Sequence, residues 1–307
     1  MKILLLGKNG QVGYELQSAL PRVGQMFACD RSQLDVSDLN QVRAVIQDIA
    51  PDLIVNASAY TAVDLAETEP ALAMRINAEA PAVMAQEAAR LQAAIIHYST
   101  DYVFDGDKTG AYTEEDLPNP QNVYGRSKLA GEQAIQASGV PHLILRTSWV
   151  YGNHGKNFLR TIQRLARERD ELRIVADQIG APTWSRTIAR TTAHIVRQLQ
   201  TQSASQQEGQ ITKDIWRQYS GLYHLTAQGQ TSWYEFAQEI VANENTATRP
   251  TVIPIATKDY PLPARRPRNS VLSSEKLIRA FGNLPNWDQA LQGCLWDGRA
   301  DGNAEQK

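Results

Sequence analysis

The feature that most constrains the fold of this chain is a short apolar run near the N-terminus that leads directly into three glycines. Residues 3–6 read Ile-Leu-Leu-Leu, and the glycines follow at Gly7, Gly10 and Gly13. A continuous apolar run of this length is typical of a strand that is buried on both faces of a parallel sheet. Apolar residues then recur with helical spacing, at Val12, Leu16 and Leu20. The sequence therefore predicts a strand, a glycine turn and a helix, in that order.

Strands and helices continue to alternate through the first half of the chain. Further strands are expected at residues 26–29, 52–56, 94–98 and 142–145, and helices around residues 42–49 and 71–91. This alternation predicts an α/β fold, in which right-handed crossovers build a Rossmann-type, doubly wound parallel sheet. The second half is less regular. It has a strand pattern at residues 222–225, a polar stretch at 200–210 that is expected to be a loop, and a capping box of Ser232 and Glu235 before an amphipathic helix.

The glycine turn reads Gly7-Lys8-Asn9-Gly10-Gln11-Val12-Gly13. Its glycines permit a tight turn and a close approach of the backbone to a pyrophosphate at the positive end of a helix. The spacing differs by one residue from the common dinucleotide motif, but the position between a strand and a helix favours NAD(P) binding over a simple packing turn. Asp30 ends the second expected strand and favours NADH through the adenosine ribose, whereas the adjacent Arg31 would meet the 2′-phosphate of NADPH. Both cofactors stay open, and Asp35 and Val36 follow where an adenine pocket is expected.

Two domains and a tail are expected from these patterns. Residues 1–150 are expected to form mainly the NAD(P)-binding Rossmann domain. Residues 151–296 are expected to form mainly a smaller C-terminal α/β substrate-binding part, with the option that some of its segments return to the first domain. Residues 297–307 are expected to be a flexible tail.

A tyrosine and a lysine four positions apart, Tyr124 and Lys128, share one face of an expected helix. The pKa of a free tyrosine is about 10, and a nearby ammonium would lower it, so the pair makes a usable general acid. Thr100 follows the fourth expected strand, at the edge where open α/β sheets bind ligands, and its hydroxyl can donate a hydrogen bond to a carbonyl oxygen. Alone, each feature also fits a solvated helical pair or a strand-end cap. Their occurrence together in a dinucleotide-binding sheet favours a catalytic site.

The composition excludes several classes of protein. The 31 lysines and arginines nearly balance 33 aspartates and glutamates. This balance indicates that binding to nucleic acid or to an anionic membrane is not the main function of this chain. No stretch approaches the ~20 apolar residues of a membrane span, and the N-terminus lacks the pattern of a signal peptide. Cys29 and Cys294 do not form a disulfide framework and are expected to be buried thiols. We expect a cytoplasmic protein without nucleic-acid or membrane partners.

Several motifs together resemble the dTDP-4-dehydrorhamnose reductases, a family of extended short-chain dehydrogenases/reductases of dTDP-L-rhamnose biosynthesis. Beside the glycine turn, they are residues 56–64, 99–104, 124–128, 146–152, 157–159, 178–183 and 266–270. The set covers nearly the whole chain, and its order is more specific than any single motif. The resemblance implies an oxidoreductase of cell-surface polysaccharide biosynthesis. Its partner would be a nucleotide-sugar substrate, and it would reduce dTDP-4-dehydro-β-L-rhamnose to dTDP-β-L-rhamnose with NADPH or NADH.

Carried over to this sequence, the resemblance implies three catalytic residues. Tyr124 would protonate the sugar C4 oxygen, Lys128 would bind the nicotinamide ribose and lower the pKa of Tyr124, and Thr100 would polarise the substrate carbonyl. The expected cofactor contacts are Gly7, Asn9, Gly10, Gln11, Val12, Asp30, Arg31, Asp35, Val36, Ala57, Ala59, Tyr60, Thr61, Tyr98, Tyr124 and Lys128. The expected substrate contacts are Thr100, Asp101, Tyr102, Trp149, Asn157 and Arg266. For Trp149 a core position is the alternative, and for Arg266 an ion pair with a carboxylate.

One departure from the family concerns a metal. Some members form a homodimer around a magnesium ion held by glutamates, and Glu15 matches one ligand position. Residues 185–187, however, read Ser-Arg-Thr where the second glutamate would fall. Because a cationic side chain does not favour a metal ion, we expect no metal site. The expected assembly is a monomer or a homodimer.

Two other functions compete with the reductase. The first is a nucleotide-sugar dehydratase or epimerase of the same fold. In this chain Asp101 is followed by Tyr102 instead of the glutamate that dehydratases use, which disfavours dehydration, but epimerases stay open. The second is a non-catalytic NADP-binding regulatory subunit, which the presence of Thr100, Tyr124 and Lys128 disfavours.

Overall fold

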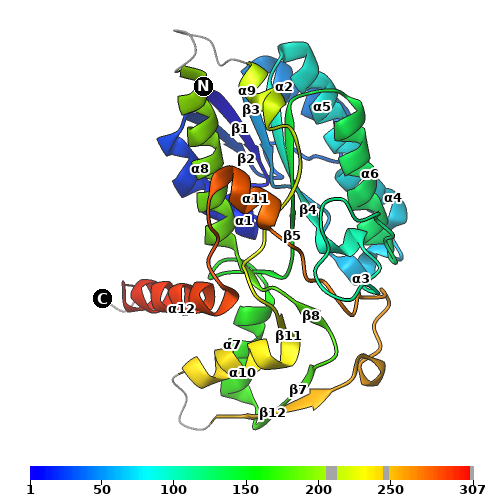
Figure 1. Cartoon of the computed structure of the whole chain (residues 1–307), viewed down its shortest axis with the longest axis vertical. Helices are drawn as coiled ribbons and strands as arrows, with labels where there is room; N and C mark the ends of the chain where they lie inside the picture. Colours follow the sequence, from blue (N-terminus) through cyan, green and yellow to red (C-terminus); the bar gives the residue numbers. More distant parts are fainter. Residues whose placement is uncertain (205–212, 245–248, 305–307) are drawn as a thin grey trace.

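The computed structural model describes residues 1–204, 213–244 and 249–304. Figure 1 shows two lobes, an upper one built on a twisted sheet and a smaller lower one, with helix α12 projecting to one side. Within these described ranges, no helix combines the length and the apolar character needed to cross a membrane.

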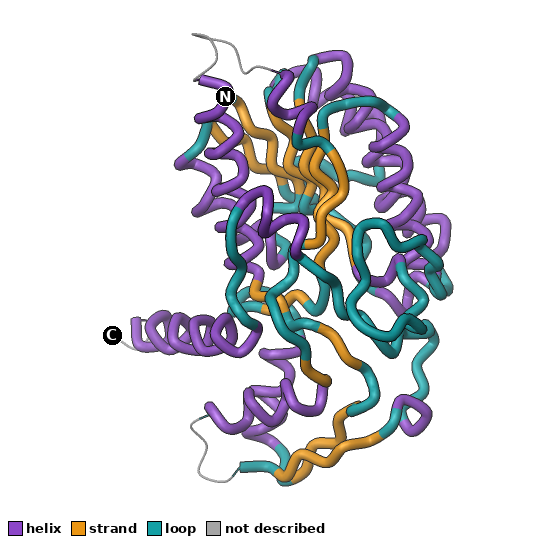
Figure 2. The backbone as a smooth tube through the Cα atoms, viewed as in Figure 1, coloured by secondary structure: helices purple, strands orange, loops and turns teal. Residues whose placement is uncertain are grey.

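The upper lobe contains a six-stranded parallel sheet with the strand order β10-β5-β4-β3-β1-β2. The sheet is drawn in orange in the upper part of Figure 2. Its strands are β1 (Lys2–Leu6), β2 (Gln25–Cys29), β3 (Leu53–Asn56), β4 (Ala94–Thr100), β5 (His142–Thr147) and β10 (Gly221–His224). The expected strands are present within one to two residues, and the doubly wound α/β class is confirmed.

Helices cover both faces of the sheet because the side chains of its strands alternate between two apolar cores. Ile3 and Leu5 of β1 lie in a core with α1 (Gln11–Ala19) and α8 (Ser185–Ala204). Leu4 and Leu6 lie in the opposite core. The helices on that side are α2 (Leu39–Ile49), α5 (Ala80–Leu91) and α6 (Val123–Ala137). Burial of all four side chains explains why the first strand reads as an unbroken apolar run.

The alanine-rich stretch expected as one helix is divided into three parts. α4 (Pro70–Met74) leads into the π-helical turn η2 (Arg75–Glu79), and α5 follows. Pro81 lies in the first turn of α5 and has no backbone N–H to donate, so the regular hydrogen-bond ladder is interrupted just before it. A short helix, α3 (Val63–Ala66), precedes this region.

The lower lobe has its own apolar core. It is formed by α7 (Phe158–Glu168), β7 (Glu171–Val175), α10 (Trp233–Asn243) and β12 (Thr251–Ile255), with β7 and β12 paired in parallel. The capping box predicted at Ser232 is present, since its hydroxyl accepts from the Glu235 amide and the Glu235 carboxylate accepts from the Ser232 amide. Two short ladders lie between the lobes: β6 (Val150–Tyr151) with β9 (Thr183–Trp184), and β8 (Ile179–Gly180) with β11 (Thr231–Ser232).

Between residues 151 and 296 the chain passes back and forth between the lobes. α8, α9 (Lys213–Gln218), β10 and α11 (Glu275–Phe281) pack with the main sheet, whereas the intervening segments build the lower lobe. The last helix, α12 (Trp287–Ala304), buries Leu291 and Cys294 in the lower core.

Two expectations differ from these boundaries. The tail expected from residue 297 onward is helical up to Ala304, because α12 continues through it. The polar stretch expected as a loop begins inside α8, and its residues from 205 onward lie outside the described part of the chain, as do residues 305–307.

Candidate active site

The glycine turn joins β1 to α1, and its shape requires glycine at two positions. Gly7 has a φ of 81°, in the left-handed region, and a Cβ on it would lie 2.7 Å from the Ala57 carbonyl oxygen. A Cβ on Gly13 would lie 2.0 Å from the Gly7 carbonyl oxygen. Helix α1 begins after Gly10 with no side-chain cap from the described residues and no acidic residue in its first turn. Its positive N-terminal end is therefore open to a pyrophosphate.

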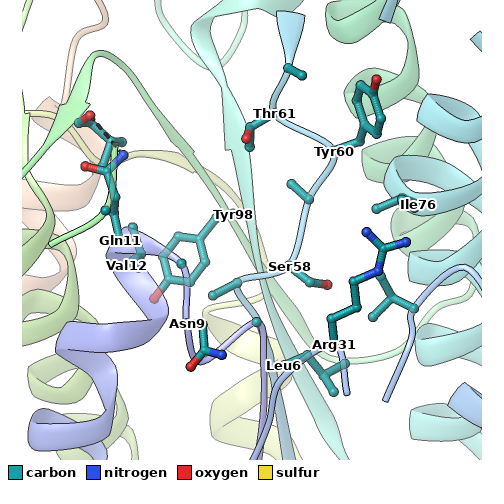
Figure 3. A pocket seen from close by; sticks show the side chains of 18 of the residues that line it. Leu6, Asn9, Gln11, Val12, Arg31, Ser58, Tyr60, Thr61, Ile76 and Tyr98 are labelled. Carbon is teal, nitrogen blue, oxygen red and sulfur yellow. Dashed lines mark hydrogen bonds between the residues drawn. The ribbon is translucent and has the colours of Figure 1, made fainter. Parts of the chain in front are cut away.

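A cavity of about 650 Å³ opens beside this turn, at the carboxyl ends of β1 and β3. The strand order reverses here, because β3 and β2 flank β1 on opposite sides, and open α/β sheets bind ligands at such a point. Figure 3 shows Gln11 and Val12 on one side of the cavity, Tyr60 and Thr61 on the other, and Tyr98 between them. The cradle of close backbone contacts and the open helix end fit a dinucleotide.

Every residue expected to contact the cofactor lines this cavity. They are Gly7, Asn9, Gly10, Gln11, Val12, Asp30, Arg31, Asp35, Val36, Ala57, Ala59, Tyr60, Thr61, Tyr98, Tyr124 and Lys128. Further lining residues that the sequence did not single out are Leu6, Leu34, Ser58, Ala62, Ile76, Ser99, Thr147, Val150, Gly155 and Lys156. Ser58 and Ser99 belong to motifs already recognised, whereas Gly155 and Lys156 reach the cavity through the packing of the second half onto the first.

The wall around Asp30 carries both signs of charge. Asp30 accepts hydrogen bonds from the amide and hydroxyl of Ser32 at 2.9 and 2.6 Å, and it lies 3.3 Å from Lys8 Nζ. These contacts, led by the Ser32 hydroxyl, hold the pKa of Asp30 at about 2. Arg31, which is labelled in Figure 3, lines the same cavity and lies 3.4 Å from Asp35. The wall thus offers a carboxylate to a ribose and cations to a 2′-phosphate, which suits NADH and NADPH alike.

Tyr124 and Lys128 line the same cavity from α6, but they do not interact in the expected way. The Lys128 Nζ donates to the Tyr98 carbonyl oxygen at 2.6 Å and lies 3.2 Å from Nε2 of His97. Burial raises the pKa of Tyr124 to about 12, and a hydrogen bond with Thr100 opposes this only partly. In this structure the ammonium is directed at β4 and burial dominates the shift, so a lowering of this pKa by Lys128 stays a prediction. Tyr124 keeps its proton at neutral pH and is available as a donor.

Thr100 and Asp101 form a buried pair next to Tyr124. The Thr100 hydroxyl donates to Asp101 at 3.0 Å and accepts from the Tyr102 amide at 3.2 Å. Burial raises the pKa of Asp101 to about 6, since desolvation outweighs its hydrogen bonds with Ser270 and Thr100. Thr100 is thereby held in one position, at the carboxyl end of β4 as predicted.

A second cavity of about 800 Å³ lies against the lower lobe and is lined by Tyr102 and Arg266. The ring of Tyr102 meets that of Tyr124 edge-on, with centroids 5.6 Å apart, so this contact links the walls of the two cavities. The guanidinium of Arg266 makes a bidentate pair with Asp64 at 3.0 and 2.7 Å. For Arg266, the alternative to a substrate contact was an ion pair with a carboxylate, and this ion pair is observed with Asp64. Arg266 also lines the second cavity.

Four expected substrate contacts, Thr100, Asp101, Trp149 and Asn157, line neither cavity. The Trp149 ring stacks on Trp233 with centroids 3.6 Å apart, and a Cβ on Gly180 would lie 2.5 Å from its other side. Trp233 lines the second cavity, so Trp149 lies behind it. Asn157 caps α7 through the Arg160 amide at 3.1 Å. A role of Trp149 or Asn157 toward a substrate stays a prediction.

Two buried polar residues hold parts of this site in place. The sequence did not single out either of them. Asn77, in η2, accepts from the Tyr60 amide at 2.8 Å and donates to the Tyr60 carbonyl and to the Ser127 hydroxyl, both at 3.0 Å. It thereby ties the Tyr60 loop to α6. His97, on β4, contacts Lys128 directly. A lone asparagine or histidine at a buried position carries no signal in the sequence that would separate it from an exposed one.

The residues around Glu15 do not fit a metal ion. Glu15 on α1 is buried, and Arg186 on α8 donates to it from Nε at 2.8 Å. The same guanidinium contacts Asp297 on α12 at 2.5 Å. A fixed cation therefore already occupies the space between the two carboxylates. Within the described residues, no group of three or more histidine, cysteine, aspartate or glutamate side chains could hold a metal.

Comparison with known proteins agrees with this geometry. The model of the family described as RmlD substrate binding domain matches residues 1–300. A dTDP-4-dehydrorhamnose reductase of Burkholderia thailandensis is 47% identical over 97% of this chain and 99% of its own length. That of Escherichia coli K12 is 43% identical over 96% of this chain and 97% of its own length.

Solved structures give the same result. The Bacillus anthracis dTDP-4-dehydrorhamnose reductase in complex with NADP superimposes with a TM-score of 0.86 at 34% identity, covering 96% of this chain and 99% of that one. The UDP-glucose 4-epimerase of Thermus thermophilus, at 16% identity and a TM-score of 0.76, shares the fold alone. Since the family model spans nearly the whole sequence and close relatives align over nearly their full length, the chain belongs to the dTDP-4-dehydrorhamnose reductase family.

Proposed function

We propose that this chain reduces the 4-keto group of dTDP-4-dehydro-β-L-rhamnose to give dTDP-β-L-rhamnose, with NADPH or NADH as the hydride donor. The observation that carries the proposal is the position of Tyr124. It lines the dinucleotide cavity, and its ring contacts Tyr102, which lines the second cavity. A proton donor between a cofactor site and a substrate site is what the reduction of a ketone requires.

The residues of the chain take the following roles in this proposal. The nicotinamide, when bound, supplies a hydride to C4 of the sugar. Tyr124 gives the proton to the C4 oxygen, and it is protonated at neutral pH because burial raises its pKa to about 12. Thr100 donates a hydrogen bond to the same oxygen as charge develops on it, for which its hydroxyl proton turns away from Asp101. Lys128 binds the nicotinamide ribose from the floor of the cavity.

The second cavity suits a nucleoside diphosphate. Its lining includes Arg173, Arg265, Arg266 and Arg268, together with Asp105, Asp107 and Asp177. Arginine pairs with phosphate oxygens through two parallel hydrogen bonds. The rings of Phe158 and Trp233, with centroids 4.5 Å apart, line the same cavity and suit an apolar plane such as a thymine or a sugar face. We therefore assign the upper lobe to the cofactor and the lower lobe, together with the Arg266 segment, to the substrate.

The wider setting follows from the reaction. We propose a cytoplasmic enzyme that acts on a small nucleotide sugar, without nucleic-acid or membrane partners, as a monomer or homodimer. We propose that residues 1–150 serve mainly the cofactor and residues 151–296 mainly the substrate, and that the segments of the second half that pack on the sheet support the cofactor side.

The direct test is consumption of NADPH and of NADH with dTDP-4-dehydro-L-rhamnose as the substrate, followed at the nicotinamide absorbance band. We expect oxidation that depends on both the sugar and Tyr124. Folded protein that binds a dinucleotide but oxidises neither cofactor would contradict the proposal and favour an epimerase or a regulatory subunit.

A separate variant, G180A, tests the assignment of the second cavity. The added methyl group would lie 2.5 Å from Cε2 of Trp149, so that ring and the Trp233 ring stacked on it must move. Loss of up to about 1.5 kcal/mol of aromatic contact raises the KM for the nucleotide sugar by up to about tenfold. The Kd for NADPH, whose cavity is lined by neither ring, should stay the same. Equal changes in both constants would argue against the separation of the two sites.

A further inference from the structure

A buried chain of hydrogen bonds runs from β3 to α6 through His97. Asn56 ends β3, His97 lies on β4 and Lys128 on α6, and each of these side chains is at most 1% exposed. The Asn56 Nδ2 lies 3.0 Å from His97 Nδ1, and the His97 Nε2 lies 3.2 Å from Lys128 Nζ. Both nitrogens of the imidazole therefore face a nitrogen of a neighbour.

The orientation of the Asn56 amide decides which imidazole nitrogen carries the proton. The Asn56 Oδ1 accepts from the amide and the hydroxyl of Ser58, at 3.1 and 2.6 Å, so this atom is the oxygen and Nδ2 faces His97. An amide nitrogen can only donate, which makes His97 Nδ1 an acceptor. Burial, helped by the charge of Lys128, lowers the pKa of His97 far below its usual value, so the ring is neutral. A neutral imidazole with an unprotonated Nδ1 carries its proton on Nε2.

This tautomer places an N–H group against the Lys128 amine. An ammonium has donors only, whereas a neutral amine has a lone pair that can accept. The contact at 3.2 Å is thus a hydrogen bond when Lys128 is neutral and an unfavourable meeting of two donors when it is charged. Burial acts in the same direction and lowers the pKa of Lys128 to about 8, while Glu132 opposes the shift.

The groups that face Lys128 Nζ come from three elements. β4 contributes His97 and the carbonyl of Tyr98, and α6 contributes Glu132. β5 acts through Arg146, which holds the Glu132 carboxylate at 2.9 and 2.6 Å. Since Arg146 neutralises much of the charge of Glu132, His97 is the direct polar side-chain neighbour of Nζ among the described residues.

We propose that His97 is a positioning residue for the reaction, which acts through Lys128 by presenting an Nε2–H group to its Nζ. This contact favours the neutral amine over the ammonium. The effect on turnover rests on the proposed reductase function, in which Lys128 binds the nicotinamide ribose. The tautomer itself does not rest on that function and is measured without substrate.

The first test is the tautomer of His97 in the wild-type protein, read from long-range ¹H–¹⁵N NMR correlations of the histidine rings. We expect a neutral ring with its proton on Nε2 that does not titrate between about pH 5.5 and 8.5. The H97Q variant identifies the resonance by its loss. If that variant does not fold, K128M identifies it by the shift that follows removal of the Nε2 partner. A proton on Nδ1 overturns the proposal.

The second test is the pH dependence of turnover and of NADPH affinity in H97Q. A glutamine at this position can turn its carbonyl oxygen toward Nζ and so favours the ammonium. The decline of kcat/KM and of NADPH affinity at alkaline pH should therefore move upward by about one pH unit. H194Q is the matched control, because His194 lies on α8 beside Arg197 and outside both cavities, and its profile should match the wild type.

The outcomes separate the two proposals. An unmoved alkaline decline in folded H97Q overturns the positioning role. Absence of turnover in the wild type overturns the reductase function, and the tautomer and the pH dependence of NADPH affinity then decide the role of His97 by themselves.

Discussion

Replacement of Tyr124 by phenylalanine removes one oxygen atom from the position that links the two cavities. The phenol has a pKa of about 12 in its buried environment, so at neutral pH practically every molecule carries the proton. The substitution therefore removes the whole of the proton-donor contribution. The ring itself remains, and with it the edge-on contact with Tyr102 at 5.6 Å.

The magnitude follows from what the hydroxyl does and does not contact. A positioned general acid contributes about 10²- to 10⁴-fold to a rate, which corresponds to roughly 3–5 kcal/mol of barrier. Thr100 keeps its hydrogen bond to Asp101, so no buried polar partner is stranded and the melting temperature changes little. Loss of one neutral hydrogen bond weakens cofactor binding by about tenfold at most.

The assay compares kcat, the Kd for NADPH and the melting temperature of Y124F with those of the wild type. Y223F is the matched control, since it removes the hydroxyl of another buried tyrosine, whose partner is the Tyr219 carbonyl and which lines neither cavity. We expect a fall of at least about 100-fold in kcat for Y124F alone. Retention of full activity in folded Y124F would refute Tyr124 as the proton donor. An equal loss in Y223F would show that the measurement reports stability instead of chemistry.

Three further variants test separate parts of the structure. D30A should raise the ratio of kcat/KM for NADPH over NADH by about tenfold, because it removes the ribose acceptor and frees the neighbouring cations; an unchanged ratio would remove Asp30 from the cofactor site. D101N should be more stable than the wild type at pH 7 by up to roughly 3 kcal/mol, although less active. The folded-state pKa of Asp101, about 6, lies above its unfolded value, so this carboxyl costs stability as pH rises from about 4 to 6, and thermal melts at pH 4 and 7 should differ accordingly. R186M should lose about 3–5 kcal/mol in urea unfolding because Glu15 is left buried without a cation, whereas R279M, at an exposed pair, should lose under about 0.5. Removal of divalent metal by EDTA should change neither the activity nor the melting temperature of the wild type, and a clear drop in either would contradict the role of Arg186.

Much of the candidate site could be predicted from local patterns. The first strand had to be buried on both faces because four apolar residues follow one another without alternation. The turn after it needed glycine at positions 7 and 13, where the folded chain leaves no room for a Cβ. Because the strands are parallel, the carboxyl ends of β1, β3 and β4 lie at one edge of the sheet. The segments that follow these strands therefore meet in one cavity. Chain order and strand periodicity therefore suffice to predict where the cofactor lies.

The tertiary structure alone decided which side chains contact each other when they lie far apart in the sequence. Helical spacing places Lys128 on the same face as Tyr124, yet its amine is directed at His97 and the Tyr98 carbonyl, because β4 packs directly under α6. Trp149 sits behind Trp233 through the pairing of short strands between the lobes.

The same distinction explains the remaining differences from expectation. Arg186 meets Glu15 and Asp297 only because α1, α8 and α12 converge at one point. β10 joins the main sheet although its residues lie in the second half of the chain. Periodicity and turn chemistry act over a few residues and are legible in the sequence. Which distant side chains share a buried contact depends on how whole elements pack, and the same local pattern is compatible with several packings.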